Sequence, residues 1–300
     1  MRKAYIQMHV AIFLWGFTGV LGRLITLSEW VLVWYRLLLT VISLLIIHLF
    51  NRQIKILPRR QLIRIMLVGT IVIAHWLTFY GAIKQCNVTI TLCCLSSIAF
   101  FTSILEPIMH RKRIDYVEVL FGLAAIAGIY TIYQVQVGFG LGIIMAIVSA
   151  FLSSLFSVMN KGLIENHSPE TVTFYELFGG LVFLTLIFPL HLYFQTDVTL
   201  LPDLTNWIYI AILSFFCTTL AFTISLRALQ KISAFTMNLS LNLEPLYGII
   251  LAFAIFQENK SLKNGFYWGA SLIVLMVAAH SYHQYYLRKK VENILKRQLK

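Results

Sequence analysis

Ten long apolar stretches, separated by short polar connections, take up most of this chain of 300 residues. A membrane-spanning helix needs about 20 consecutive apolar residues, and continuous runs such as these lack the alternating pattern of a transmembrane barrel. The connections are too short to hold a soluble domain, so we predict an all-α membrane protein built from ten transmembrane helices. The predicted spans cover residues 4–27, 31–50, 65–83, 86–109, 116–135, 139–160, 172–194, 207–226, 233–256 and 266–286.

The charged residues are few and lie mostly between these spans. Only 12% of the residues are charged, whereas a soluble domain has about a quarter. The net charge of +12 comes from short clusters of Lys and Arg at span ends, which is the pattern that orients membrane proteins. With the N-terminus in the cytoplasm, nineteen basic residues face inward and four face outward. We therefore expect a multi-pass protein of the cell inner (plasma) membrane, with both termini cytoplasmic, surrounded by the lipid bilayer and without a nucleic-acid partner.

The two halves of the sequence resemble each other. Trp34-Tyr35-Arg36 aligns with Phe174-Tyr175-Glu176, and each half holds five spans. An odd number of spans gives the two halves opposite orientations in the membrane. Inverted repeats are a recurring transporter design, in which one half rocks against the other around a site near the midplane. We expect a first five-helix repeat at residues 1–136, a second at 137–286 and a basic cytoplasmic tail at 287–300.

The stretch LNLEPLYGIILAFAIFQE, residues 241–258, carries a Glu-Pro pair within an apolar run and closes on Gln257-Glu258. With the five-plus-five plan, it resembles the drug/metabolite transporter superfamily, EamA family. In that family each half commonly ends in an apolar helix with a central proline and a Gly-Glu-like turn. The first half departs from this pattern, with Ile98-Ala99 in place of the proline and Arg111-Lys112 in place of the closing turn. The resemblance covers about residues 6–286 and implies a ten-helix permease that exports amino acids or related metabolites.

Glu244 and Pro245 lie near the middle of the predicted span 233–256. A carboxylate or a proline at mid-membrane is costly unless it faces protein or water. We therefore predict a helix kink at Pro245, with Glu244 in the substrate pathway, where it takes a proton as the coupling ion or binds a substrate ammonium group. The alternative is a carboxylate that only packs between helices, held by a hydroxyl such as that of Ser240.

Three further polar residues within the spans are candidates for the substrate pathway or for coupling: Arg36, Glu176 and His75. Arg36 and Glu176 are repeat equivalents, so the inverted arrangement places them toward opposite membrane faces, each lining one vestibule. Either side chain could instead extend to the nearest interface. For His75 the sequence favours helix packing through one hydrogen bond, and a proton relay is the alternative.

Aromatic side chains within the spans could line a ligand cavity, although aromatics also pack helices and anchor interfaces. The four that we expect to reach the pathway are Trp15, Tyr35, Trp76 and Tyr247. Small residues in the first span, namely Gly16, Gly19 and Gly22, predict close packing of that helix against its neighbours.

The predicted function is secondary active or facilitative transport of small polar metabolites by alternating access. The sequence has no phosphate-binding loop for ATP and no catalytic or metal-ligand motif, so we expect no cofactor, no metal and no enzymatic activity. One alternative is a sugar-phosphate or nucleotide-sugar exchanger, which would need several cations where Arg36 stands alone. Another is a non-transporting membrane sensor or a lipid-processing enzyme. The sequence is compatible with a monomer or a homodimer.

Overall fold

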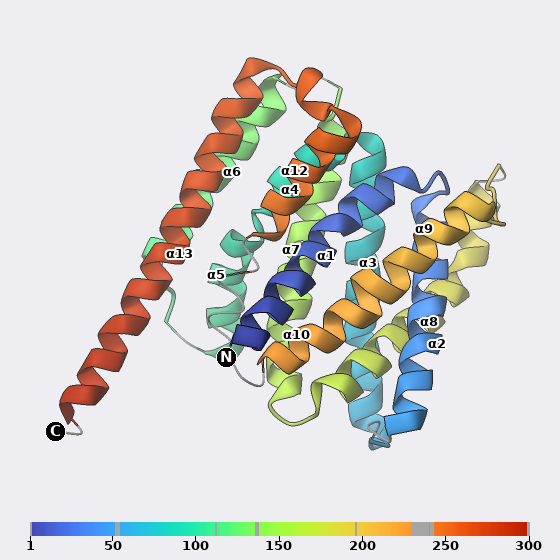
Figure 1. Cartoon of the computed structure of the whole chain (residues 1–300), viewed down its shortest axis with the longest axis horizontal. Helices are drawn as coiled ribbons and strands as arrows, with labels where there is room; N and C mark the ends of the chain where they lie inside the picture. Colours follow the sequence, from blue (N-terminus) through green and yellow to red (C-terminus); the bar gives the residue numbers. More distant parts are fainter. Residues whose placement is uncertain are drawn as a thin grey trace.

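The computed structural model describes residues 2–51, 55–111, 113–135, 138–195, 197–229, 240 and 243–298, and these residues form helices and loops without a strand. The helices pack as one bundle (Figure 1). They are α1 (Arg2–Leu24), α2 (Glu29–Asn51), α3 (Arg59–Gln85), α4 (Val88–Leu95), α5 (Ile98–His110), α6 (Tyr116–Val135), α7 (Gly140–Ile164), α8 (Pro169–Phe194), α9 (Leu204–Ser214), the π-helix η1 (Phe215–Leu220), α10 (Ala221–Leu229), α12 (Glu244–Phe256), the 3₁₀ helix η2 (Glu258–Lys260) and α13 (Asn264–Gln298).

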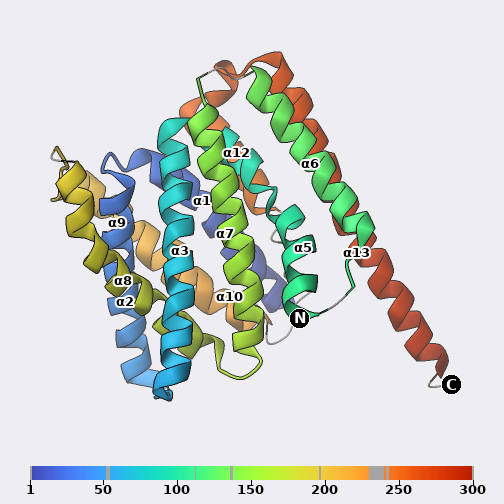
Figure 2. The same ribbon diagram turned by 180° about the vertical axis from the view of Figure 1, so that it is seen from behind.

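The chain runs back and forth along the bundle, and both termini lie at the same end of it (Figures 1 and 2). We call this the proximal end, and the opposite end, with the loops at residues 25–28 and 86–87, the distal end. Among the described residues, eight helical stretches are long and apolar enough to cross a membrane, and α12 and the segment Asn264–Ala279 are apolar but shorter. The predicted all-α membrane fold is confirmed, while the count of ten spans and the side of the termini stay predictions.

Two predicted spans are interrupted where the sequence indicated continuous helices. The span 86–109 is divided into α4 and α5 at Ser96 and Ser97, whose N–H groups turn back to the carbonyls of Cys93 and Cys94 at 3.3 and 3.0 Å. The span 207–226 contains the π-helix η1 between α9 and α10. Most of residues 233–243, the first part of a third predicted span, lie outside the described residues.

Pro245 does not lie inside a helix, as the predicted kink required, but in the first turn of α12. Glu244 is the first residue of this helix, and a turn at Leu243 precedes it. The N–H groups of a first helical turn have no partner within the helix, so the missing N–H of a proline costs nothing there. The predicted kink at Pro245 was wrong. The apolar run continues on both sides of Glu244 and Pro245, so nothing in the pattern indicated that a helix begins there.

The helices keep equivalent positions in the two halves of the chain. Arg36 and Glu176 are each the eighth residue of their helix, α2 and α8. α5 and α12 are both 13 residues long. They are followed by Arg111 and Gln257, which have left-handed backbone conformations with φ of 52° and 54°. This conformation favours glycine, so the expected Gly-Glu-like turn is formed here with a non-glycine residue at the left-handed position in both halves.

The bundle has a compact body and a helix pair at one edge. α3 lies against both α7 and α8, and α1 lies against α10 and α12. α6 and α13 run side by side at the edge of the bundle (Figures 1 and 2). The largest buried apolar cluster is in the body, between α1, α2, α3, α8 and α9, and it surrounds the polar residues described next.

Candidate functional site

Arg36 is a charged side chain in the interior of the bundle, only 5% exposed. Its Nε and Nη2 donate hydrogen bonds to Thr218 Oγ1 at 3.2 and 3.1 Å, and its Nη1 donates to the Tyr80 hydroxyl at 2.6 Å. Its Cζ lies 3.7 Å from the centre of the Trp76 ring, which is a cation–π contact. Three neutral side chains therefore hold Arg36 inside the bundle, and it does not extend to a membrane interface.

These contacts leave part of the guanidinium's hydrogen-bonding capacity unused. Arginine has five N–H groups, and the two that remain, one on each Nη, have no partner among the described residues. No carboxylate in the described part of the chain forms an ion pair with Arg36, although Glu244 lies close enough to interact with it electrostatically. A buried cation with free N–H groups is suited to binding a carboxylate or a phosphate oxygen.

The π-helix η1 places Thr218 against Arg36. The Thr218 hydroxyl donates to the carbonyl of Leu213, five residues earlier, at 2.9 Å, and the neighbouring Thr219 hydroxyl lies 2.6 Å from Ser43 Oγ on α2. Single π turns inside α-helices are frequent at functional sites. Sequence reasoning missed this segment, and the only signal was a Thr-Thr pair within an apolar run.

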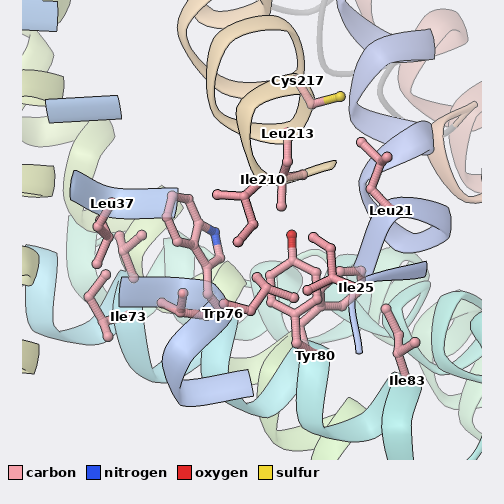
Figure 3. Packing of buried hydrophobic residues seen from close by; sticks show 14 of the residues in the cluster. Leu21, Ile25, Leu37, Ile73, Trp76, Tyr80, Ile83, Ile210, Leu213 and Cys217 are labelled. Carbon is pink, nitrogen blue, oxygen red and sulfur yellow. The ribbon is translucent and has the colours of Figure 1, made fainter. Parts of the chain in front are cut away.

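Trp76 and Tyr80 of α3 form the aromatic side of this site. Both are buried, and Figure 3 shows their side chains extending toward Ile210 and Leu213 of α9. Trp76 was one of the four aromatic residues expected in the pathway. Tyr80 was not among those four, since aromatic residues in apolar spans also pack helices and anchor interfaces.

Glu244, Tyr247 and Trp15 lie together where α1, α10 and α12 meet. A Cβ on Gly16 would stand 3.0 Å from the Glu244 carbonyl oxygen and from Tyr247 Cβ, so α1 and α12 approach closely there, as the glycine pattern predicted. The Trp15 ring packs edge-on against Phe222 of α10, with ring centres 5.6 Å apart. The half-buried Glu244 stands in the first turn of α12, where the helix dipole favours a negative charge.

Two other candidates occupy packing positions. Tyr35 points toward α9, with its ring edge-on to Trp207 at 4.9 Å between centres. His75 Nδ1 lies 2.9 Å from the Ser149 carbonyl oxygen and 2.8 Å from Ser149 Oγ of α7. The structure therefore places Tyr35 at the α2–α9 contact and His75 at the α3–α7 contact.

Glu176 is the second buried charged residue among the candidates, 5% exposed on α8. No ion pair joins it to Arg36. Asn160 of α7 donates from Nδ2 to both carboxyl oxygens, at 2.9 and 3.1 Å. Asn160 was not identified from the sequence, since one asparagine near the end of an apolar span has many ordinary explanations.

At the distal end, Glu258 joins the two halves of the chain. It is 4% exposed and accepts a hydrogen bond from Arg23 Nη1 of α1 at 2.9 Å. It also accepts from the N–H groups of Val88 and Thr89 at 3.2 and 2.9 Å. The carboxylate thus caps α4, where helix N–H groups and the helix dipole favour a negative charge. We call this cluster of Arg23, Glu258 and the start of α4 the distal latch.

We predict that Glu258→Ala loosens the distal end. A recess there is lined by Arg23, Ile83, Lys84 and the half-buried Cys86, whereas Cys93, Cys94 and Cys217 are buried. Hydrogen bonds to a charged group contribute about 1.5–3 kcal/mol, so alkylation of Cys86 should become at least about tenfold faster. Mass spectrometry of the alkylated peptide measures this rate.

The matched control is Lys260→Ala, which removes an exposed charge from the same short helix η2. This variant should leave the Cys86 rate unchanged. Equal rates in Glu258→Ala and the unsubstituted protein would mean that the latch does not hold the distal end closed.

Apolar helices of membrane-spanning length, arranged as two structural halves around buried polar residues, define the chain as a multi-pass membrane protein. The chain belongs to the EamA-like transporter family, whose model matches residues 2–134 and again residues 140–280. It is 23% identical over 256 residues to "Uncharacterized transporter YxxF" of Bacillus subtilis (strain 168), covering 83% of this chain and 80% of that protein. A protein crystal structure shares the fold, with a TM-score of 0.63 at 15% identity over 96% of this chain and 99% of the other.

Proposed function

We propose that this protein is a secondary transporter of small polar metabolites, working by alternating access and exporting amino acids or related compounds. It would lie in the cell inner membrane with ten spans and both termini, hence its proximal end, in the cytoplasm. The repeats at residues 1–136 and 137–286 would rock against each other, and the tail 287–300 would remain cytoplasmic. The excess of basic residues on the proximal side supports this orientation.

The observation that carries the proposal is the buried Arg36 with two N–H groups to spare. A solute carboxylate could accept one hydrogen bond from each of these two N–H groups, as a bidentate partner. The half-buried Glu244 lies within electrostatic reach of Arg36 and could bind an ammonium group. An α-amino acid carries both groups on one carbon atom, so the pair Arg36 and Glu244 fits a zwitterion better than a solute of one charge. Trp76 would form the wall beside the carboxylate, and Trp15 and Tyr247 the wall beside the ammonium group.

The second candidate is a sugar-phosphate or nucleotide-sugar exchanger. The recess lined by Arg23 and Lys84 at the distal end favours it, since two cations there could attract a phosphorylated solute. Against it, Arg36 is the one buried side chain among the Lys and Arg residues that the structure describes. A phosphate dianion in the interior would need more than this single charge.

The test is the thermal stability of the purified protein with a panel of amino acids, nucleobases and sugar phosphates. A ligand present at 100 times its Kd stabilises the folded state by about 2.7 kcal/mol, which raises the unfolding temperature measurably. We expect a shift with one class of amino acids and none with the methyl esters of the same compounds, which lack the carboxylate. A shift with sugar phosphates alone would reject the amino-acid proposal in favour of the exchanger.

A further inference from the structure

The contact between Glu176 and Asn160 differs from that of Glu258, the other buried carboxylate among the described residues. Glu258 has Arg23 as its partner, whereas Glu176 has only an amide. Asn160 Nδ2 donates to both oxygens of Glu176, at 2.9 and 3.1 Å. The other end of the same amide, Asn160 Oδ1, is buried without a hydrogen-bond partner. The Asn160 amide therefore uses its donor group on Glu176, while its acceptor oxygen has no partner in the interior of the bundle.

The surroundings of Glu176 are tightly packed and offer it no positive charge. A Cβ on Gly69 of α3 would stand 1.9 Å from the Glu176 carbonyl oxygen, so α3 and α8 meet almost backbone to backbone there. No hydrogen bond or ion pair of the described residues joins Glu176 to an ionisable side chain. The ionisable groups on this half of the helices that pack against α8 are His48 on α2, Arg59, Arg60, Arg64 and His75 on α3, and Lys161 on α7.

An amide can serve both protonation states of a carboxyl group. Asn160 Nδ2 donates to the carboxylate, and after a half-turn of the amide Oδ1 would accept the proton of the carboxylic acid at the same position. The two orientations exchange the positions of the amide nitrogen and oxygen and occupy nearly the same space. A lysine or arginine partner would instead fix the carboxylate, because a buried charge needs a compensating one. Since Glu176 lacks such a partner, its neutral form suits the packed interior better.

We propose that Glu176, with Asn160, is a proton-binding site that operates the proximal gate of the transporter. This inference rests on the proposed function as a transporter. Glu176 is the eighth residue of α8, about 10 Å from the proximal start of that helix, and Asn160 is only half-buried. When the proximal end opens, water reaches the carboxyl group and takes its proton. When it closes, the carboxylate takes a proton back from water, because an unpaired charge is costly at a position that is only 5% exposed.

The position gives the two repeats different tasks. Arg36 and Glu176 occupy the same place in α2 and α8, one counted from the distal end and the other from the proximal end. The first repeat thus carries a fixed positive charge, and the second carries a carboxyl group that can become neutral. Solute would bind at the fixed charge, and pH on the proximal side would set how readily the gate closes.

The first test is infrared spectroscopy of the purified protein in bilayers, which needs no substrate. The C=O stretch of a protonated carboxyl group should be present at neutral pH and lost in Glu176→Gln. Asn160→Leu, which removes the amide, should shift the frequency of the same band, so the test survives if Glu176→Gln does not fold. Glu244→Gln is the control that separates any band of the second carboxyl group. A band that is absent, or unchanged in both Glu176→Gln and Asn160→Leu, would overturn the proposal whether or not the protein transports.

The second test is solute exchange in proteoliposomes with the pH set separately on each side. In the unsubstituted protein, flux should fall about tenfold when pH is raised on the proximal side alone, since the carboxylate resists closure. Glu176→Gln, which is permanently neutral, should keep its flux across the same range, while Glu165→Gln, which removes an exposed carboxylate between α7 and α8, should retain the dependence on proximal pH. The same dependence in Glu176→Gln as in the unsubstituted protein would remove Glu176 from the gate. If neither the unsubstituted protein nor any variant shows flux while the infrared band is present, the transport proposal is rejected instead.

Discussion

Replacing Arg36 by glutamine should lower the affinity for the transported solute by a factor of about one hundred or more. Removing one partner of a buried charged contact typically costs about 2–5 kcal/mol, and 1.4 kcal/mol corresponds to a factor of ten. Glutamine keeps a polar end that can reach Tyr80 or Thr218 but lacks the charge and the forked N–H groups. Isothermal titration calorimetry with the amino acid identified by the stability panel measures the loss.

Lysine at the same position separates charge from geometry. Arg36→Lys retains the positive charge but loses the planar group that stacks on Trp76 and the paired N–H donors. We expect it to bind about tenfold more weakly than the unsubstituted protein. Arg23→Gln, which removes an arginine at the distal latch, should leave the affinity within about twofold. Equal affinity of Arg36→Gln and the unsubstituted protein would place the solute carboxylate elsewhere.

The methyl ester of the same amino acid gives a control on the ligand side. The ester has no charged carboxylate to accept hydrogen bonds from the two free N–H groups of Arg36, so it should bind weakly to every form of the protein. Consequently, Arg36→Gln should weaken binding of the acid strongly and binding of the ester little. A parallel loss for both ligands would indicate a damaged fold rather than a lost carboxylate contact.

The helical spans could be predicted because the membrane imposes a length and an apolar composition on each helix. Residues 116–135, for example, are both the predicted span and the observed helix α6. The breaks within spans could not be predicted in the same way. Ser96 and Ser97 divide α4 from α5 without a proline or glycine, and the π-helix of residues 215–220 differs from its neighbours by only one extra residue per turn. Both depend on tertiary contacts that leave no periodic signal.

The individual polar residues were easier to find than their partners. A charged residue in an apolar run is conspicuous, so Arg36, Glu176 and Glu244 could be chosen from the sequence alone. Their partners are ordinary polar residues: Thr218 lies 182 residues from Arg36 in the chain, and Asn160 lies in the helix before that of Glu176. The repeat gave the correct equivalence of Arg36 and Glu176, since α2 and α8 have the same register. It gave no indication that one would be held by hydroxyl groups and the other by an amide.

Glu244→Gln should have the second large effect, on binding of the ammonium group and on the response to a pH gradient. If Glu244 binds the substrate ammonium, the neutral variant should bind the amino acid about one hundredfold more weakly. Its affinity for the N-acetylated compound, which has no ammonium group, should change little. If Glu244 also carries the coupling proton, a pH gradient should no longer drive solute accumulation in proteoliposomes. Glu165→Gln, which removes an exposed carboxylate between α7 and α8, is the matched control and should behave like the unsubstituted protein.

The double variant Arg36→Gln/Glu244→Gln decides whether the two residues act on one solute. Two groups that hold the ends of the same zwitterion should be coupled, so the loss in the double variant should be smaller than the combined losses of the single variants. Independent losses would mean that Glu244 acts apart from the Arg36 site. Full pH-driven accumulation in Glu244→Gln would exclude Glu244 as the coupling residue. Since Glu176 is expected to set only the dependence on proximal pH, accumulation driven by the gradient and flux at fixed pH separate the roles of the two carboxyl groups.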